Sequence, residues 1–420
     1  MRGSRFNPLV GVIDALQAGD WSRGPAQAQD IAQILVEGQP DSGQVSKDPF
    51  WPQTEMGLIT AIILAMAEYA PAEQAHLYSA FTALAESPDG SITDEWFDDP
   101  DRYPPGHAAK LAYSATKAAG KADETRAGIF TGAMAALRLF ADPQIAWMTA
   151  ESDHDLAAIG QELTATYLIV PWENPTRWSI AGLYLSLTIR ALARLANQNS
   201  GRLPVPVHFV LDEFGNFPAI PGFASLITVA RSLGIRFTLA VQALEQLKNR
   251  YPKAHETIRG NTGTWIFLKS QDENTTKTLS TMIGQYTLSK ASHTMPKLSF
   301  FNNSVPGSAT ESSQLSGRSL ITSDELLRWP TGQSLILQAG YAPARLPLPD
   351  LSQWATVFPA IQTRREDDLL EGNPPPPALW PLELAILASE PVGAPAIQQS
   401  GPQRVIRDED ETTAAAAFRA

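Results

Sequence analysis

The stretch Val207–Pro218, VHFVLDEFGNFP, decides how this sequence is expected to fold. A run of strand-forming residues, VHFVL, ends in two adjacent carboxylates, Asp212 and Glu213, and Phe-Gly-Asn follows them. A buried strand of this kind delivers an aspartate to Mg²⁺ and places a glutamate beside the water that attacks a phosphate. The stretch therefore predicts a Walker-B strand. Surface carboxylates after an ordinary strand remain the alternative interpretation.

The motif that normally accompanies a Walker-B strand is absent from the sequence. The pattern G-x-x-x-x-G-K-[ST] occurs nowhere in the 420 residues. Gly38 and Gly43 have the right spacing, but Gln44 and Val45 follow them, so the phosphate-binding Lys and the Mg²⁺-binding hydroxyl are missing. We expect this sequence to carry the metal side of a nucleotide site without its phosphate cradle.

Other polar residues are candidates for the same site. Gln242 ends the next predicted strand, TLAVQ, and the carboxyl ends of neighbouring parallel strands open on one crevice. There its side chain would sense the γ-phosphate or orient water, and a plain strand-end cap is the alternative. Guanidinium groups match the geometry of phosphate. Four arginines are therefore candidates for phosphate binding or for an arginine finger: Arg231, Arg236, Arg259 and Arg318. For each of them, a solvated surface residue is the alternative interpretation. Asp212 is the predicted Mg²⁺ ligand.

The texture of the sequence predicts an α/β protein with four regions. Strands alternate with helices from residue 151 onward, which favours a mainly parallel, helix-covered sheet that includes a strand at Thr166–Pro171. The Ala-rich stretch before it has helical spacing broken by prolines and glycines. The predicted regions are residues 1–48, the start of the α/β core; 49–150, an all-α domain; 151–352, the core with the Walker-B strand; and 353–420, a Pro-rich acidic tail, mostly disordered, with a short helix around Pro381–Leu387.

Composition narrows the functional classes. The net charge of −12 excludes a protein that binds nucleic acid over its whole surface, so any DNA contact must be local. The sequence has no cysteine, which excludes disulfides and thiolate chemistry. The longest apolar run, Gly57–Ala67, is far short of the roughly 20 residues of a membrane helix. We therefore expect no transmembrane segment and no signal peptide in this sequence.

Three blocks resemble the TraG/VirD-type coupling proteins of type IV secretion and conjugation systems. They are LDEFGNFPAIPGFASLITVARSLGIRFTLAVQALEQL (211–247), IRGNTGTWIFLKSQDENTTKTLSTMIGQYT (258–287) and GRSLITSDELLRWPTGQSLILQAGYAPAR (317–345). The order of elements is also similar over roughly residues 5–350. Asp212 and Glu213 match the Walker-B pair of the family, and Gln242 matches its strand-end Gln.

The resemblance implies a RecA-like P-loop NTPase core with an inserted all-α domain. It implies ATP and Mg²⁺ as cofactors and a homo-hexameric ring at the inner face of the cell membrane. The implied partners are single-stranded DNA, relaxosome or effector proteins, and components of the secretion channel.

The sequence departs from the family at its start. Family members begin with transmembrane helices and a P-loop strand, and this sequence begins downstream of both, so the core is expected to be partial. We expect no ATP hydrolysis by this chain alone, and a truncated gene, a fragment and a split motor whose P-loop lies on a separate chain all remain open.

Two alternative functions remain open beside the motor chain. One is a non-catalytic module that recruits substrates for the same system, and the other is an FtsK- or HerA-like DNA-translocating ATPase. The presence of Asp212, Glu213 and Gln242 together favours the motor over the recruiting module. The inserted helical domain and the GRSLITSDELL block argue against the DNA pump.

Overall fold

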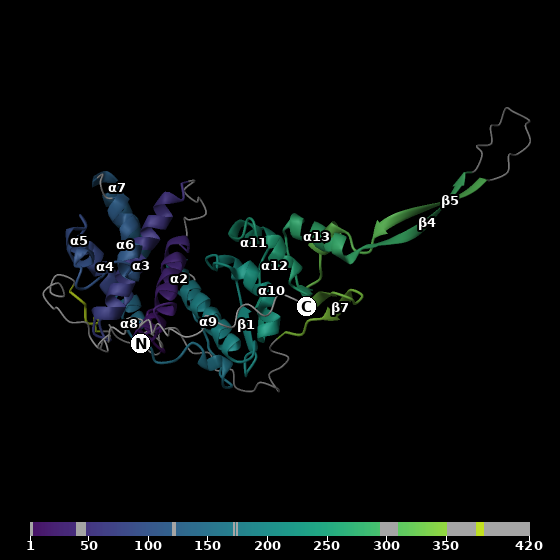
Figure 1. The fold of residues 1–420 in the computed structure, drawn as a ribbon. Helices are drawn as coiled ribbons and strands as arrows, with labels where there is room; N and C mark the ends of the chain where they lie inside the picture. The colour runs from purple at the N-terminus through teal and green to yellow at the C-terminus, as the bar shows by residue number, and fades with distance from the viewer. Residues whose placement is uncertain are drawn as a thin grey trace, which may run out of the picture.

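The structure is a computed structural model that describes residues 3–38, 48–119, 123–170, 173, 175–294, 310–350 and 375–381. Helices of the first 150 residues gather on one side of the molecule, and the strands lie on the other side (Figure 1). The α-helices of the first side are α1 (Val10–Gln17), α2 (Arg23–Glu37), α3 (Phe50–Tyr69), α4 (Leu77–Glu86), α5 (Ser91–Asp98), α6 (Ala108–Ala119), α7 (Asp123–Leu137) and α8 (Pro143–Ala150).

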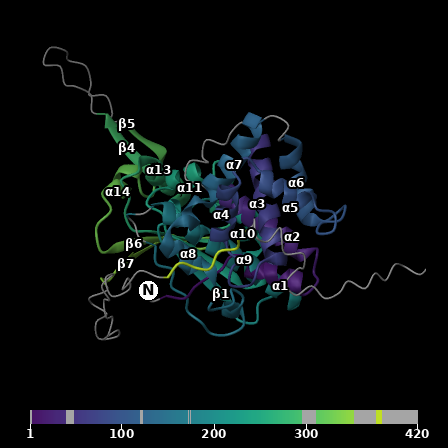
Figure 2. The ribbon, with the colours of Figure 1, turned by 90° about the vertical axis from the view of Figure 1, so that its left-hand side faces the viewer.

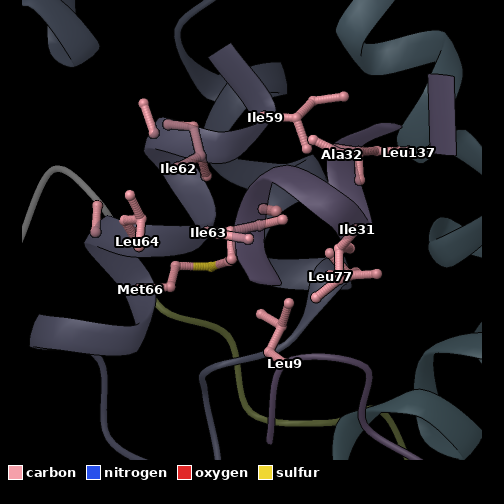
Figure 3. Close-up of a cluster of buried hydrophobic side chains, with 14 of the residues drawn as sticks. Leu9, Ile31, Ala32, Ile59, Ile62, Ile63, Leu64, Met66, Leu77 and Leu137 are labelled. Carbon is pink, nitrogen blue, oxygen red and sulfur yellow. The ribbon is translucent and has the colours of Figure 1, made fainter. Parts of the chain in front are cut away.

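Helix α3 is the centre of the helical side. Its segment from Leu58 to Ala67 is buried on every face, because neighbouring helices surround it. Figure 3 shows α3 side chains, among them Ile59, Ile62 and Ile63, beside residues of α2, α4 and α7. Helices α1 and α2 belong to the same core, so the domain boundary predicted at residue 48 falls between helices that pack on one another.

Two helices reach the length and apolar composition of a membrane span. They are α3 and α9 (Trp178–Gln198), with 20 and 21 residues and a mean hydropathy of 1.2 each. In both, 61% of the most apolar window is buried inside the protein. This burial is what core helices of a folded domain display, so the two helices give only weak support for membrane insertion.

The strand-containing side starts from a parallel pair. Strand β1 (Val207–Leu211) lies parallel to β2 (Ile235–Leu239), in a register that pairs Val207 with Ile235 and Leu211 with Leu239. Helices α9 and α10 (Phe223–Leu233) contribute to the core on one face of this pair, where Phe209 is buried. The opposite face is bare: Val210 is 70% exposed, and His208 is exposed and lies 2.9 Å from Thr238 Oγ1. The position of His208 inside the apolar run VHFVL predicts a buried core histidine, and that expectation is wrong.

The remaining strands are antiparallel, so the expectation of a mainly parallel sheet was wrong for the described residues. Strand β3 (Thr264–Phe267) pairs with β6 (Gln333–Gln338), which pairs with β7 (Ala344–Pro347). Strands β4 (Gln285–Thr294) and β5 (Thr310–Ser319) form a hairpin that projects from the body as an arm (Figure 1). The helices of this part are α11 (Leu244–Arg250), α12 (His255–Gly260), α13 (Glu273–Ile283) and α14 (Ser323–Leu327).

Two further expectations meet a different outcome. The predicted strand at Thr166–Pro171 is absent: residues 163–170 have no regular structure, and Tyr167 and Ile169 are 86% and 74% exposed. A strand exists by pairing, and no described strand lies beside this stretch. Of the predicted tail, residues 375–381 are described and pack on the helical side (Figure 2, yellow). The helix predicted at Pro381–Leu387 lies outside the described residues after Pro381.

Candidate functional site

The carboxyl ends of β1 and β2 form one edge, and backbone hydrogen bonds fasten it. The N–H of Ala240, after β2, donates to the carbonyl of Leu211 at 3.0 Å. The N–H of Phe214, after β1, donates to the carbonyl of Ala240 at 2.9 Å. The segment with Asp212 and Glu213 is therefore held beside the segment that leads to Gln242. This is the juxtaposition that the sequence predicted from parallel neighbouring strands.

Asp212 and Glu213 are both exposed, and their local geometry is specific. The N–H of Glu213 donates to Asp212 Oδ1 at 3.0 Å. Glu213 has φ 49° and ψ 39°, in the left-handed region that a side chain makes unfavourable. Asn216 Nδ2 donates to Glu213 Oε2 at 2.8 Å, which fixes the direction of the carboxylate. Strained residues of this kind cluster at functional sites.

Gln242 is held through its backbone, and its side chain is exposed. Its N–H donates to Gln246 Oε1 at 3.0 Å, and its carbonyl accepts from Ser270 Oγ at 3.2 Å. Its side-chain amide makes no hydrogen bond among the described residues. Gly215 packs so closely on Gln246 that an added Cβ would lie 2.8 Å from the Gln246 Cβ. The loop after β1 therefore packs closely against the segment that follows β2. The side-chain amide of Gln242 remains available to a ligand.

The four candidate arginines occupy different elements. Arg231 lies in the last turn of α10 and Arg236 on β2, both exposed, and neither forms an ion pair with a described residue. Arg259, at the end of α12, binds Glu256 Oε1 at 2.8 Å and lies over the ring of Trp265 at 5.7 Å. Arg318, on β5, binds Glu325 Oε1 at 3.2 Å. None of the four contacts Asp212 or Glu213 within the described residues, and their assignment stays a prediction.

The carboxylates at this edge suit the metal-binding part of a Mg²⁺–nucleotide site. Mg²⁺ takes one or two protein carboxylates and completes its shell with water and substrate phosphates, so the exposed carboxylate of Asp212 is a suitable ligand. No cluster of three or more His, Cys, Asp or Glu is present in the described parts of the chain. Gly43, Gln44 and Val45, the residues at the failed P-loop spacing, lie outside the described residues. The described residues therefore supply a metal ligand, Asp212, and a glutamate, Glu213, whose carboxylate is oriented by Asn216.

Sequence reasoning missed the residues that support these side chains. Asn216 orients Glu213, and Gln246 and Ser270 hold the backbone of Gln242. The signal for Asn216 was available, because an amide three residues after a carboxylate in a tight turn is a natural partner. The roles of Gln246 and Ser270 depend on how the loop after β2 meets the chain after β3, which the sequence does not reveal.

Comparison with known proteins places the chain within a family. A family model described as "Type IV secretory system Conjugative DNA transfer" matches residues 1–347. Among curated proteins, Protein VirD4 of Rhizobium radiobacter is 27% identical over 175 residues, which are 40% of this chain and 25% of that protein. Protein VirD4 of Agrobacterium fabrum (strain C58 / ATCC 33970) is 24% identical over 216 residues, 50% of this chain and 30% of that protein. This chain thus spans less than a third of the length of these relatives.

Solved structures with a similar fold are those of a conjugative coupling protein. Bacterial conjugative coupling protein TrwBdeltaN70 matches with a TM-score of 0.52 and 15% identity, over 78% of this chain and 68% of that one. Plasmid coupling protein TrwB in complex with ADP and Mg²⁺ matches with a TM-score of 0.50 and 13% identity, over 83% and 79%. At this identity the likeness concerns the fold, and it confirms the expected α/β, RecA-like coupling-protein class.

Proposed function

Because this chain belongs to the type IV secretory family of conjugative DNA transfer proteins, we propose that it is a motor chain of a coupling protein. In this proposal it works at the inner face of the cell membrane as part of a homo-hexameric ring. It uses ATP to deliver single-stranded DNA, with relaxosome or effector proteins, to the secretion channel. The observation that carries the proposal is the β1–β2 edge, where Asp212, Glu213 and the loop of Gln242 are fastened together.

Each residue at this edge has a proposed role. Asp212 holds the Mg²⁺ that accompanies ATP, and the metal offsets the negative charge of the phosphates. The Glu213 carboxylate, directed by Asn216, takes a proton from the attacking water. The side-chain amide of Gln242 contacts the nucleotide. Binding of the nucleotide thereby affects the conformation of the loop after β2, whose backbone at Gln242 is bonded to Gln246 and Ser270. The solved relative TrwB in complex with ADP and Mg²⁺ makes ATP and Mg²⁺ the cofactors to expect.

The phosphate-binding loop must come from outside these 420 residues, because they contain no G-x-x-x-x-G-K-[ST]. Two surfaces are suited to receive it, and they support this part of the proposal. Among the described strands β1 pairs only with β2, so its other edge is open to an added strand. Residues 163–169 are exposed and rich in strand-forming side chains, so they can pair with an added strand. The added strand belongs either to an earlier part of the same polypeptide or to a separate chain.

Reconstitution tests the proposal. The chain is mixed with a polypeptide that carries the membrane helices and P-loop strand of a related coupling protein, and ATP turnover is measured with and without single-stranded DNA. We expect no turnover above background from the chain alone, and DNA-stimulated turnover from the mixture. A mixture whose partner has its P-loop lysine replaced by alanine is the control and should be inactive. Turnover by the lone chain, or complexes that form but stay inactive with DNA, would contradict the proposal.

A non-catalytic recruiting module is the second candidate, and one observation favours it. The helical side has a large, continuous core of its own, separate from the core beneath the β1–β2 edge. Such a unit can bind substrates without nucleotide. Binding of relaxosome proteins that is unchanged by Asp212→Ala, together with an inactive reconstituted mixture, would favour this second function.

A further inference from the structure

A short segment near the end of the chain lies on the first turn of α4. Residues 375–381, PPPALWP, have no regular secondary structure. They contact residues about three hundred positions earlier: His76 Nε2 lies 2.8 Å from the carbonyl of Ala378, and the N–H of Trp380 donates to Ser79 Oγ at 3.2 Å. Figure 2 shows this segment in yellow, next to the helical side. The contacts join the predicted all-α region (49–150) to the predicted Pro-rich tail (353–420).

His76 binds the backbone of this segment through Nε2 of its ring. It is fully buried and caps α4, with Nδ1 accepting the N–H of Ser79 at 3.2 Å. Because Nδ1 is the acceptor, Nε2 carries the proton and donates it to the Ala378 carbonyl. Ser79 then accepts from Trp380. The first turn of α4 therefore satisfies one carbonyl and one N–H, two residues apart, on an extended chain.

The side chain of Trp380 fills an aromatic pocket. Trp380 is 4% exposed, and its ring meets that of Trp96 edge to face, with centroids 5.3 Å apart. Trp96 is fixed in turn, since its indole N–H donates to Tyr103 Oη at 3.1 Å and the Arg102 guanidinium lies 3.8 Å from its ring. The neighbouring Leu379 is 39% exposed. One anchor is buried and the next side chain points outward, which is how a groove holds a peptide.

We propose that the first turn of α4 and the Trp96 pocket form a binding site for a short, extended, proline-preceded peptide with a tryptophan anchor. The occupant in this chain is its own segment 375–381. The prolines lower the entropy that an extended peptide loses on binding. His76 and Ser79 set the register, and the pocket selects the indole. This site is separate from the β1–β2 edge and goes beyond the proposed motor function.

A labelled peptide with the sequence of residues 374–382, PPPPALWPL, is the probe. Its fluorescence polarisation is measured with the full-length chain, with Trp380→Ala and with Leu379→Ala as the matched control. Wild type and Leu379→Ala should exclude the peptide, because the attached segment competes at high effective concentration. Trp380→Ala vacates the pocket and should bind the peptide at least about tenfold more tightly than wild type. A peptide with alanine in place of tryptophan should bind to none of them.

Equal binding to wild type and Trp380→Ala, or binding to neither, would overturn the proposal. A second measurement uses wild type alone, in case Trp380→Ala fails to fold. Hydrogen exchange of the Trp380 amide, which donates to Ser79, should be at least about tenfold slower in the chain than in the free peptide. Equal exchange rates in the two would overturn the proposal as well.

Discussion

Glu213 has a backbone conformation that glutamate rarely adopts. Its φ of 49° lies in the left-handed region, and Ser200 is the other non-glycine residue with positive φ among those described. The conformation turns the chain sharply after β1 and leaves the Glu213 carboxylate exposed within reach of Asn216. The assignment of the Glu213 carboxylate to a catalytic site stays a prediction from the sequence. The strain follows from the path of the loop, which is set by contacts with the chain after β2.

Two replacements of Glu213 measure the cost of its left-handed backbone separately from the loss of its carboxylate. Glu213→Gly and Glu213→Ala both remove the carboxylate and its bond to Asn216, but only glycine adopts this φ without a Cβ clash. We expect Glu213→Gly to be more stable than Glu213→Ala by about 1 kcal/mol. Chemical denaturation of the two variants measures the difference. Equal free energies of unfolding would mean that residue 213 is not left-handed in solution.

His76 predicts a pH dependence. Burial lowers the pKa of His76 below its ordinary value of 6.5, since its charged form would lose water, although the Ala378 carbonyl partly opposes the shift. The unfolded chain therefore binds more protons than the folded chain as pH falls below 6.5. This contribution to stability is complete above 6.5 and is lost as the pH falls towards the lowered pKa of the folded state.

A matched variant isolates this effect. Asn is a good N-cap, so His76→Asn keeps the cap of α4 and removes the titrating ring. We expect the unfolding midpoint to fall more in wild type than in His76→Asn between about pH 7.5 and about pH 5.5. Thermal unfolding followed by circular dichroism gives both differences. A larger fall in the variant would contradict the burial of a neutral His76.

Among the helices and strands, the spacing of apolar residues predicted an element well where those residues form one buried face. Apolar spacing predicts helices over residues 25–37, 53–69 and 179–197, and α2, α3 and α9 occupy these stretches to within a few residues. VHFVL is β1, as expected. Short helices such as α1 and α5 were missed, because eight residues give little periodicity. Strand pairing was harder to predict. The residues of TWIFL (264–268) indicate a strand, but nothing in them indicates that β3 runs antiparallel to β6. The same limit explains the strand wrongly expected at Thr166–Pro171, since strand formation depends on a partner.

The contact between the two loops at the site can be tested through Gly215. An alanine Cβ there would lie 2.8 Å from Gln246 Cβ, whereas at Gly263 it would meet no atom within 4 Å. We expect Gly215→Ala to lower the free energy of unfolding by about 1–3 kcal/mol through overpacking. Gly263→Ala is the control and should change it by less than about 1 kcal/mol. Urea unfolding measures both, and equal effects would show that the loops are not in contact.

The whole molecule divides by its cores in a way that composition did not predict. One core joins α1 to α8 with part of α9 and Trp380, a second lies beneath β1–β2, and a third joins β3, β6, α13 and α14. The border that the sequence predicts at residues 150–151 stays a prediction, because α9 contributes side chains to both of the first two cores. The membership of Trp380 in the helical core depends on tertiary contacts, since it lies about three hundred residues after the α4 residues that its segment contacts.

Fragments test this division. A fragment of residues 1–160 keeps α1 and α2 on α3, and a fragment of residues 50–150 exposes the α3 face that they cover. Each large aliphatic side chain uncovered costs about 1.5–3 kcal/mol of burial. We therefore expect the longer fragment to unfold at a clearly higher temperature than the shorter one, by circular dichroism. Equal midpoints would mean that α1 and α2 add nothing to the helical core.

The central claim concerns the β1–β2 edge, and ATP turnover by the reconstituted motor tests it most directly. Asp212→Ala should reduce turnover by at least about a hundredfold through loss of the metal ligand. Glu213→Gln should reduce it similarly but leave nucleotide bound, because the amide cannot take a proton from water. Filter binding of labelled ATP separates the two variants. Turnover in Asp212→Ala equal to that of wild type would contradict the account, since this strand would then not be the one that holds the metal.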